Sequence, residues 1–360
     1  MSALQAAGVT WPSDEEAVDL LTRMVQIYSP STEEREIAAF LAQTMSGWGL
    51  QAYRDPVGNA VGHIGEGGRH VVLLGHMDTF PGQIPVRREG KLLYGRGTVD
   101  AKGPLAAFLV AAARVGPLHG LRVTVIGAVE EETYSSAGAH YAVQLYRPDF
   151  TIIGEPSRWN RITLGYKGVW GIRYRLRHRM AHTAGQQRGV NEEAVEFWQR
   201  MVRWAEAFNA GKTARFDTLD PSLRDICSEN DAFQEWVEMQ IGFRLPPGLP
   251  LEDLQAEVEV QKGEAEIERL NCEPPFRAEK SNVLCGTMLY AIRAEGGQPA
   301  FVYKTGTSDM NVVGPVWNCP IIAYGPGDSS LDHTPDEHTD LEEYLRAIHV
   351  LTRALQRLAA

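Results

Sequence analysis

Histidine and carboxylate side chains gather in five short segments that follow, or lie just beyond, predicted strands. The residues are His76 with Asp78, Asp100, the three glutamates Glu130, Glu131 and Glu132, Glu155, and His333 with Glu337. Open α/β sheets place their sites at the carboxyl ends of strands. Imidazole nitrogens and carboxylate oxygens suit a pair of zinc ions. Because none of these side chains is a cysteine thiol, the set predicts a catalytic metal centre rather than a closed structural site.

Each segment alone admits a simpler interpretation. His76 and Asp78 are two residues apart, so in a strand both side chains point to one side and the carboxylate can orient the imidazole. They also fit a polar strand end. Asp100 has two oxygens that could bridge two metal ions, or it could cap a helix. The glutamates 130–132 repel one another at a strand end, which a dication would relieve, although they could be a solvated charge run.

The elements that would position these side chains alternate between strand and helix. Unbroken apolar runs at residues 71–76, 122–129 and 149–156 predict strands buried on both faces. Two Ser-x-x-Glu patterns, at 13–16 and 31–34, predict capping boxes that begin two helices. The alternation predicts a three-layer α/β/α domain with a mixed, mostly parallel sheet.

The pattern changes after residue 167. Apolar and polar residues then alternate with period 2, which predicts a strand with one solvent-facing side, and a helix, strand, helix and strand follow. This β-α-β-α-β order predicts a smaller α+β, ferredoxin-like insert over residues 168–277. Residues 1–167 and 278–360 would then form the catalytic domain.

The composition narrows the class of protein. A net charge of −11 over 360 residues argues against a nucleic-acid binder. No segment has the roughly 20 apolar residues of a membrane span. The first residues lack the basic-then-apolar pattern of a secretory signal, so we expect a cytoplasmic protein that does not contact a membrane.

The motifs GHMDT, GRGTVDAKG, VEEET, GEPS and DHTPDE, in this order, resemble those of the family-20 dizinc metallopeptidases. That family includes acetylornithine deacetylase, succinyl-diaminopimelate desuccinylase, aminoacylase and carboxypeptidase G. The resemblance implies two divalent metal ions, zinc with cobalt as an alternative. It implies that Asp100 bridges them, that His76 and Glu155 bind one ion, and that Glu132 and His333 bind the other.

The resemblance also implies the residues that act beside the metals. Asp78 would support His76, and Glu131 would be the general base that takes a proton from the attacking water and returns it to the leaving amine. The family usually has Asp-Glu-Glu where this chain has Glu-Glu-Glu. A shift by one residue, to Glu130 and Glu131, therefore stays open.

In the family, the insert is a lid that also forms a homodimer. RMAHTAG is similar to the lid motif and implies that His182 donates to the reaction's oxyanion, in the partner subunit's site. IGFRLPPG implies that Arg244 clamps a substrate carboxylate, and TGTSD implies that Gly306 and Thr307 contact substrate.

VEEETYSSAGAHY and LGYKGVWG are similar to stretches of the carrier-protein-linked lysine or ornithine hydrolases of lysine and arginine biosynthesis. This implies release of lysine or ornithine from the C-terminal glutamate of a small acidic amino-group carrier protein. Three alternatives stay open: a deacylase of small N-acyl amino acids such as N-acetylornithine, a dipeptidase or aminopeptidase, and a catalytically inert relative that only binds.

A basic segment bears on the partner. Residues 156–191 hold no Asp or Glu, and Arg173, Arg175, Arg177 and Arg179 would share one face of a strand. An acidic protein docking there would neutralise the row. Pairing with acids of neighbouring strands would do so equally well. The candidate acids are Glu257, Glu259, Glu264 and Glu266.

Overall fold

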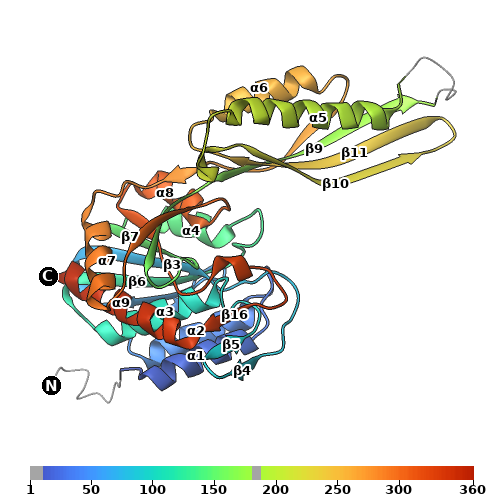
Figure 1. Cartoon of the computed structure of the whole chain (residues 1–360). Coiled ribbons are helices and arrows are strands. Elements are labelled where there is room, and N and C mark those ends of the chain that lie inside the picture. The colour runs from blue at the N-terminus through green and yellow to red at the C-terminus, as the bar shows by residue number, and fades with distance from the viewer. Residues whose placement is uncertain (1–10, 181–187) are drawn as a thin grey trace. The chain divides into compact units, whose positions relative to one another are not determined.

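The computed structural model describes residues 11–180 and 188–360, which form two compact units (Figure 1). The large unit comprises the described residues up to Gly165, together with Ala278–Tyr303 and Ser308–Ala360. The insert unit comprises the described residues of Tyr166–Arg277 and also Lys304–Thr307, a short segment that the sequence pattern had left in the catalytic domain.

The centre of the large unit is a mixed sheet with the strand order β1-β2-β6-β3-β7-β15-β8, and β14 also pairs with β8. Its four middle strands are parallel, whereas β1, β2 and β8 pair antiparallel with their neighbours. The bounds are β1 Gln51–Arg54, β2 Ala60–Ile64, β3 Glu66–His76, β6 His119–Ala128, β7 Phe150–Gly154, β8 Arg161–Tyr166, β14 Ala300–Lys304 and β15 Ile321–Ala323. The predicted mixed, mostly parallel sheet is confirmed.

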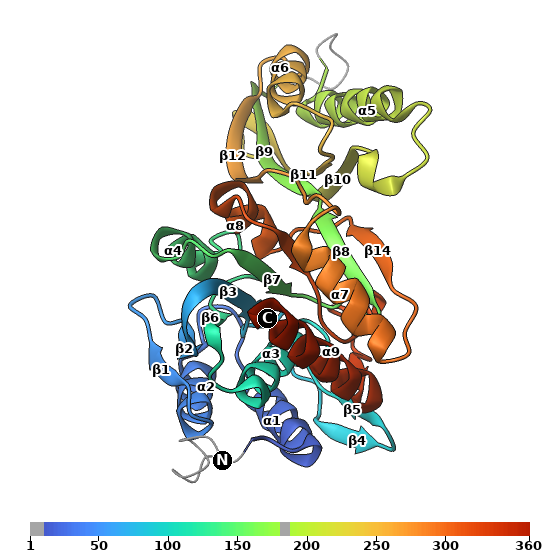
Figure 2. The ribbon, with the colours of Figure 1, turned by 90° about the vertical axis from the view of Figure 1, so that its left-hand side faces the viewer.

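Helices cover both faces of this sheet, which gives the predicted three-layer arrangement (Figures 1 and 2). On one side α3 packs against α9, and α1 and α7 contact this pair; α4 packs against α8. The bounds are α1 Asp14–Gln26, α2 Arg35–Gly47, α3 Lys102–Val115, α4 Ala137–Leu145, α7 Val283–Ala294, α8 Asp309–Trp317 and α9 Leu341–Ala359. A small sheet of β4 Arg87–Glu89, β5 Leu92–Tyr94 and β16 His338–Asp340 completes the unit.

The insert unit has the element order β-α-β-β-α-β, with one strand more than the sequence pattern predicted. Its antiparallel sheet runs β10-β11-β9-β12, and α5 and α6 share one apolar core with it. The bounds are β9 Gly168–Arg179, α5 Val190–Asn209, β10 Asp220–Asn230, β11 Gln234–Leu245, α6 Leu251–Gln261 and β12 Glu266–Glu273, followed by β13 Phe276–Arg277. This order and topology confirm the ferredoxin-like prediction.

The two predicted helix starts differ in outcome. The Ser13 box is confirmed: its hydroxyl accepts the Glu16 N–H at 3.2 Å, and the Glu16 carboxylate accepts the Ser13 N–H at 2.7 Å. The second box is wrong. Helix α2 begins at Arg35, and its cap residue Glu34 makes no side-chain capping bond. The side chains at positions 31 and 34 have partners elsewhere in the fold.

Every helix within the described ranges, 11–180 and 188–360, is too short or too polar to span a membrane.

Candidate metal centre

Two groups of potential metal ligands meet in the large unit and share one residue. His76, Asp100 and Glu155 form one group, and Asp100, Glu132 and His333 form the other; within each group the ligand atoms lie within 4.8 Å of one another. Oδ1 of Asp100 lies 3.3 Å from Nε2 of His76, and Oδ2 lies 3.1 Å from Nε2 of His333. The two oxygens of one carboxylate therefore face different groups, as a bridging ligand requires.

Three parallel strands deliver most of these side chains to one edge of the sheet. His76 is the last residue of β3, Glu155 directly follows β7, and the 130–132 run comes just after β6. Because β3 lies between β6 and β7 and parallel to both, their carboxyl ends meet. Asp100 precedes α3, and the peptide bond that follows it is cis. His333 comes from the connection between β15 and β16.

The three consecutive glutamates point to different surroundings. The Glu132 carboxylate oxygens lie 3.1 and 3.0 Å from Nε2 of His333. Oε2 of Glu131 lies 4.0 Å from Nε2 of His76. Glu130 instead accepts a hydrogen bond from the Ser135 hydroxyl at 2.5 Å. The structure thus brings Glu131 and Glu132 to the two ligand groups.

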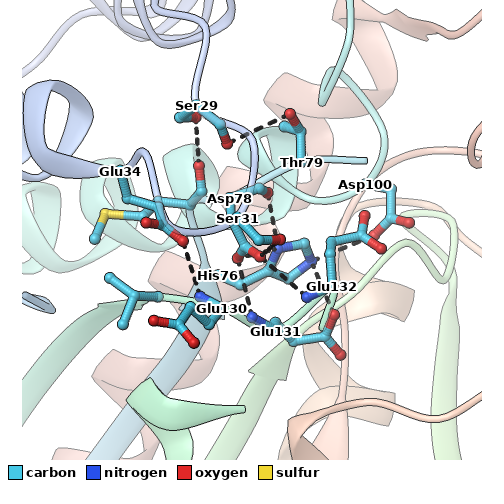
Figure 3. A network of polar contacts seen from close by, with 12 residues as sticks. Ser29, Ser31, Glu34, His76, Asp78, Thr79, Asp100, Glu130, Glu131 and Glu132 are labelled. Carbon is cyan, nitrogen blue, oxygen red and sulfur yellow. Dashed lines mark hydrogen bonds and ion pairs between the residues drawn. The ribbon is translucent and has the colours of Figure 1, made fainter. Parts of the chain in front are cut away.

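Asp78 contacts both His76 and the loop of these glutamates. Nδ1 of His76 is 3.0 Å from the main-chain oxygen of Asp78 and 3.3 Å from its Oδ1. The fully buried carboxylate accepts the main-chain N–H groups of Glu131 at 3.2 Å and Glu132 at 3.0 Å, and the Ser31 hydroxyl at 2.7 Å (Figure 3). Nδ1 of His76 therefore faces both the carbonyl group and the carboxylate of Asp78, and the same carboxylate orients the loop after β6.

The electrostatics of the centre favour cations. Burial, with the charges of nearby carboxylates, raises the pKa of Glu131 and of Glu155 well above the ordinary value. Hydrogen bonds to Asp100 and Glu132 raise the pKa of His333 to about 10. The buried carboxylates repel one another and are costly without positive charge between them. This set of nitrogen and oxygen donors fits two divalent metal ions, which would offset that repulsion.

Three acidic residues near the centre were not assigned roles from the sequence. Burial is the main cause of the raised pKa of Glu131 and Glu155, and the charge of Asp309, at the start of α8, adds to it in both. Asp332 has the same effect on Glu155. Glu337 is fully buried and accepts the Asp100 N–H at 3.2 Å. Both Asp309 and Glu337 lie within recognised motifs, TGTSD and DHTPDE, so the signal was present.

Three of the residues predicted to contact substrate lie in the insert unit. Nη1 of Arg244, on β11, donates a hydrogen bond to the Thr307 hydroxyl at 3.3 Å, and Gly306 is the residue next to Thr307. Arg244 and Thr307 are 63 positions apart in the chain and come together within one unit. His182 lies outside the described residues.

Comparison with known proteins identifies the family. The model of "Peptidase family M20/M25/M40" matches residues 72–357, a range that contains every candidate metal ligand. The chain belongs to this family. It is a hydrolase of amide bonds, as the motifs predicted.

Individual M20 relatives cover nearly the whole chain. A Deinococcus radiodurans protein named "[LysW]-lysine hydrolase" is 45% identical over 357 residues, 96% of this chain and 98% of the relative. An M20 family metallo-carboxypeptidase of Sulfolobus solfataricus has a similar fold, with a TM-score of 0.77, 17% identity and coverage of 95% and 98%. So does the Bacillus subtilis YXEP protein, described as a dinuclear metal binding peptidase, with a TM-score of 0.69, 13% identity and coverage of 96% and 98%.

Proposed function

We propose that this M20 enzyme releases lysine, or ornithine, from a small acidic amino-group carrier protein in the cytoplasm. It would hydrolyse the amide bond that joins the amino acid to the carrier's C-terminal glutamate. The observation that supports hydrolysis most directly is the Asp100 carboxylate, shared between two ligand groups. The name of the 45% identical relative supports the substrate.

We assign one metal ion to His76 and Glu155 and the other to Glu132 and His333, with Asp100 as the shared ligand. Zinc suits these ligands, and cobalt binds the same donor types. When bound, the two ions polarise the scissile carbonyl and ease the ionisation of water at neutral pH.

We assign the general base to Glu131. Its side chain lies at the centre but is not part of either group of three ligands. A carboxylate that lies beside the ligand groups without belonging to either can accept a proton from the attacking water and later deliver it to the leaving amine.

On the substrate side we assign Arg244 to a carboxylate, for which the planar guanidinium fork is suited. Thr307 orients that fork through its hydroxyl, and Gly306 leaves space for the substrate backbone. His182, in the partner subunit of a homodimer, would donate to the oxyanion.

Two of the four arginines of the basic row pair with acids of their own sheet, in the manner of the second sequence interpretation. Arg173 pairs with Glu238 at 2.8 Å and with Glu268 at 2.9 Å. Arg175 pairs with the same two acids, at 2.7 and 3.1 Å. These acids lie on β11 and β12, and neither was among the four named from the sequence. Arg177 lies over the Trp236 ring, 5.5 Å from its centroid.

This pairing favours a second candidate, a deacylase of small N-acyl amino acids, which needs no positive docking surface. For the carrier hypothesis we therefore place the contact at Arg177 rather than along the whole row. Arg177→Ala should raise KM for the carrier-linked substrate several-fold and leave KM for N-acetyl-lysine unchanged. Arg173→Ala is the matched control on the same face. Equal effects of Arg177→Ala on both substrates would count against docking there.

The decisive experiment compares kcat/KM for carrier-linked lysine, carrier-linked ornithine, N-acetyl-lysine, N-acetylornithine and free dipeptides on the metal-loaded enzyme. We expect carrier-linked lysine to be cleaved at least 100-fold more efficiently than the small substrates, about 3 kcal/mol of transition-state discrimination. Comparable or faster cleavage of an N-acetyl amino acid would replace this function with the deacylase.

Glu131→Gln tests the mechanism separately from the substrate. Loss of general acid–base catalysis should lower kcat by about 10²- to 10⁴-fold. The two metal ions should remain, because Glu131 is not assigned as a ligand. A variant with the full rate would show that Glu131 is not the base.

A further inference from the structure

The connection between α1 and α2 runs along the end of β3 and is joined to it by several hydrogen bonds. Pro30 forms a parallel bridge with Thr79. The Ser29 hydroxyl donates to the Met77 carbonyl at 2.8 Å, and the Thr79 N–H donates to the Ser29 carbonyl at 2.9 Å. Figure 3 shows this segment beside His76 and Asp78. The segment is therefore bonded to the residues that directly follow His76 and Asp78 in the chain or lie between them.

Ser31 and Glu34 extend from this segment to the groups that hold the catalytic loop. The Ser31 hydroxyl donates to Oδ2 of Asp78 at 2.7 Å. Oε1 of Glu34, whose residue is only 5% exposed, accepts the N–H of Glu130 at 3.0 Å and the N–H of Thr32 at 2.9 Å. These are the two side chains whose spacing predicted a capping box, and neither caps α2.

Both donors to Glu34 have an unfavourable backbone conformation. Glu130 has φ +60° and Thr32 has φ +75°, in the left-handed region that residues with a side chain rarely adopt. Such residues persist only where their surroundings hold them. A buried carboxylate oxygen that accepts both N–H groups is such a restraint.

Three successive main-chain N–H groups of the loop after β6 are held by two carboxylates. Glu34 accepts from Glu130, and Asp78 accepts from Glu131 and Glu132. Because Glu131 lies between two fixed residues and its own N–H is also held, this arrangement sets the direction in which its side chain leaves the backbone. Loss of the Glu34 bond would release one end of the loop and leave the bonds to Asp78 in place.

We propose that Glu34 and Ser31 are positioning residues for the base Glu131, and that they act by fixing the backbone of the 130–132 loop. This inference depends on the proposed role of Glu131. None of the assigned ligands of the two metal ions contacts the Glu34 carboxylate through a side chain. Disturbance of the loop should therefore reduce kcat more than KM or metal content.

The experiment compares Glu34→Leu with Glu34→Gln. Leucine removes the acceptor, whereas the amide oxygen of glutamine can accept both N–H groups. We expect Glu34→Leu to lower kcat by about 10- to 100-fold, as misplacement of a catalytic group by about 1 Å does. KM should stay within about twofold and metal content at two per chain. Glu34→Gln should retain near wild-type kcat, and Glu33→Leu, at the exposed neighbouring position, is the matched control.

Ser31→Ala provides a second test if Glu34→Leu folds poorly. It should lower kcat several-fold at unchanged KM, and Ser31→Thr, which keeps the hydroxyl, should restore the rate. Wild-type kcat in both Glu34→Leu and Ser31→Ala would overturn the proposal. A fall in kcat accompanied by an equally large rise in KM and by loss of metal would also overturn it. Failure of the base assignment is a different outcome, because it would appear as an unchanged rate in Glu131→Gln.

Discussion

Asp78→Asn perturbs a buried side chain that contacts both His76, at 3.3 Å from Oδ1 to Nδ1, and the loop after β6. Oδ1 of Asp78 accepts the Glu131 N–H, and Oδ2 accepts the Glu132 N–H and the Ser31 hydroxyl. Asparagine has one side-chain oxygen. In either orientation, its NH₂ group must face one of the two main-chain N–H groups. The substitution therefore replaces at least one hydrogen bond with two opposed donors.

The expected magnitude follows from these contacts. A buried N–H without an acceptor costs about 1–3 kcal/mol. The remaining bonds lose their charged acceptor, which is worth roughly 1 kcal/mol more than a neutral one. We therefore expect a loss of about 2–4 kcal/mol in the free energy of unfolding of the metal-free protein. Displacement of the loop that carries Glu131 should lower kcat of the metal-loaded enzyme about 100-fold.

Urea unfolding of chelator-treated protein measures the first quantity, and turnover of carrier-linked lysine measures the second. Asp231→Asn is the control. Oδ1 of Asp231 accepts the N–H groups of both Phe233 and Gln234, so one amide oxygen can keep both bonds. We expect wild-type stability and wild-type kcat from this variant. If Asp78→Asn matches the wild type in both stability and kcat, Asp78 does not hold the loop.

Three further outcomes are expected. Asp100→Asn keeps one metal-binding oxygen, so elemental analysis should find one ion per chain; two ions would contradict the shared ligand. Chelation should abolish amide hydrolysis, and zinc or cobalt should restore it; activity that survives metal removal would contradict the metal mechanism. Burial and the Arg122 guanidinium, which donates to Nδ1 at 3.0 Å, lower the pKa of His70 from 6.5 to about 4. The neutral imidazole thus stabilises the fold above pH 6.5, and this contribution is lost as the pH falls through 4. The difference corresponds to about 3 kcal/mol. Allowing for solvent screening, we expect about half of that between pH 7 and 4 in urea unfolding, and a weaker pH dependence in His70→Gln. Equal pH dependence of the two proteins would show that His70 is not responsible.

The strands that carry the metal centre could be predicted because they are buried on both faces. The ends of β3 and β6, and all of β7, are short apolar runs bounded by turn residues, which is the pattern of strands in a parallel sheet. Strand β10 was missed for the opposite reason. It is an edge strand whose last seven residues are all exposed, and Pro221 lies near its start, so neither burial nor alternation marks it.

Local spacing could not predict the partners of Ser31 and Glu34. The pattern of a capping box is present, but Ser31 binds Asp78, 47 residues away, and Glu34 binds the N–H of Glu130, 96 residues away, in addition to that of Thr32. Contacts formed by the folded chain outweigh the local preference there. The orientation of the three glutamates depends in the same way on the left-handed backbone of Glu130, which no neighbouring residue type requires.

The order of the ligands along the chain affects how the enzyme matures. His76, Asp100 and Glu155 all precede the insert unit, whereas His333 follows it. During synthesis, the group of His76, Asp100 and Glu155 is therefore complete before the insert unit has been made. The group of Asp100, Glu132 and His333 stays incomplete until the chain that follows the insert has been added. A nascent chain that ends within the insert can thus assemble one of the two groups and not the other.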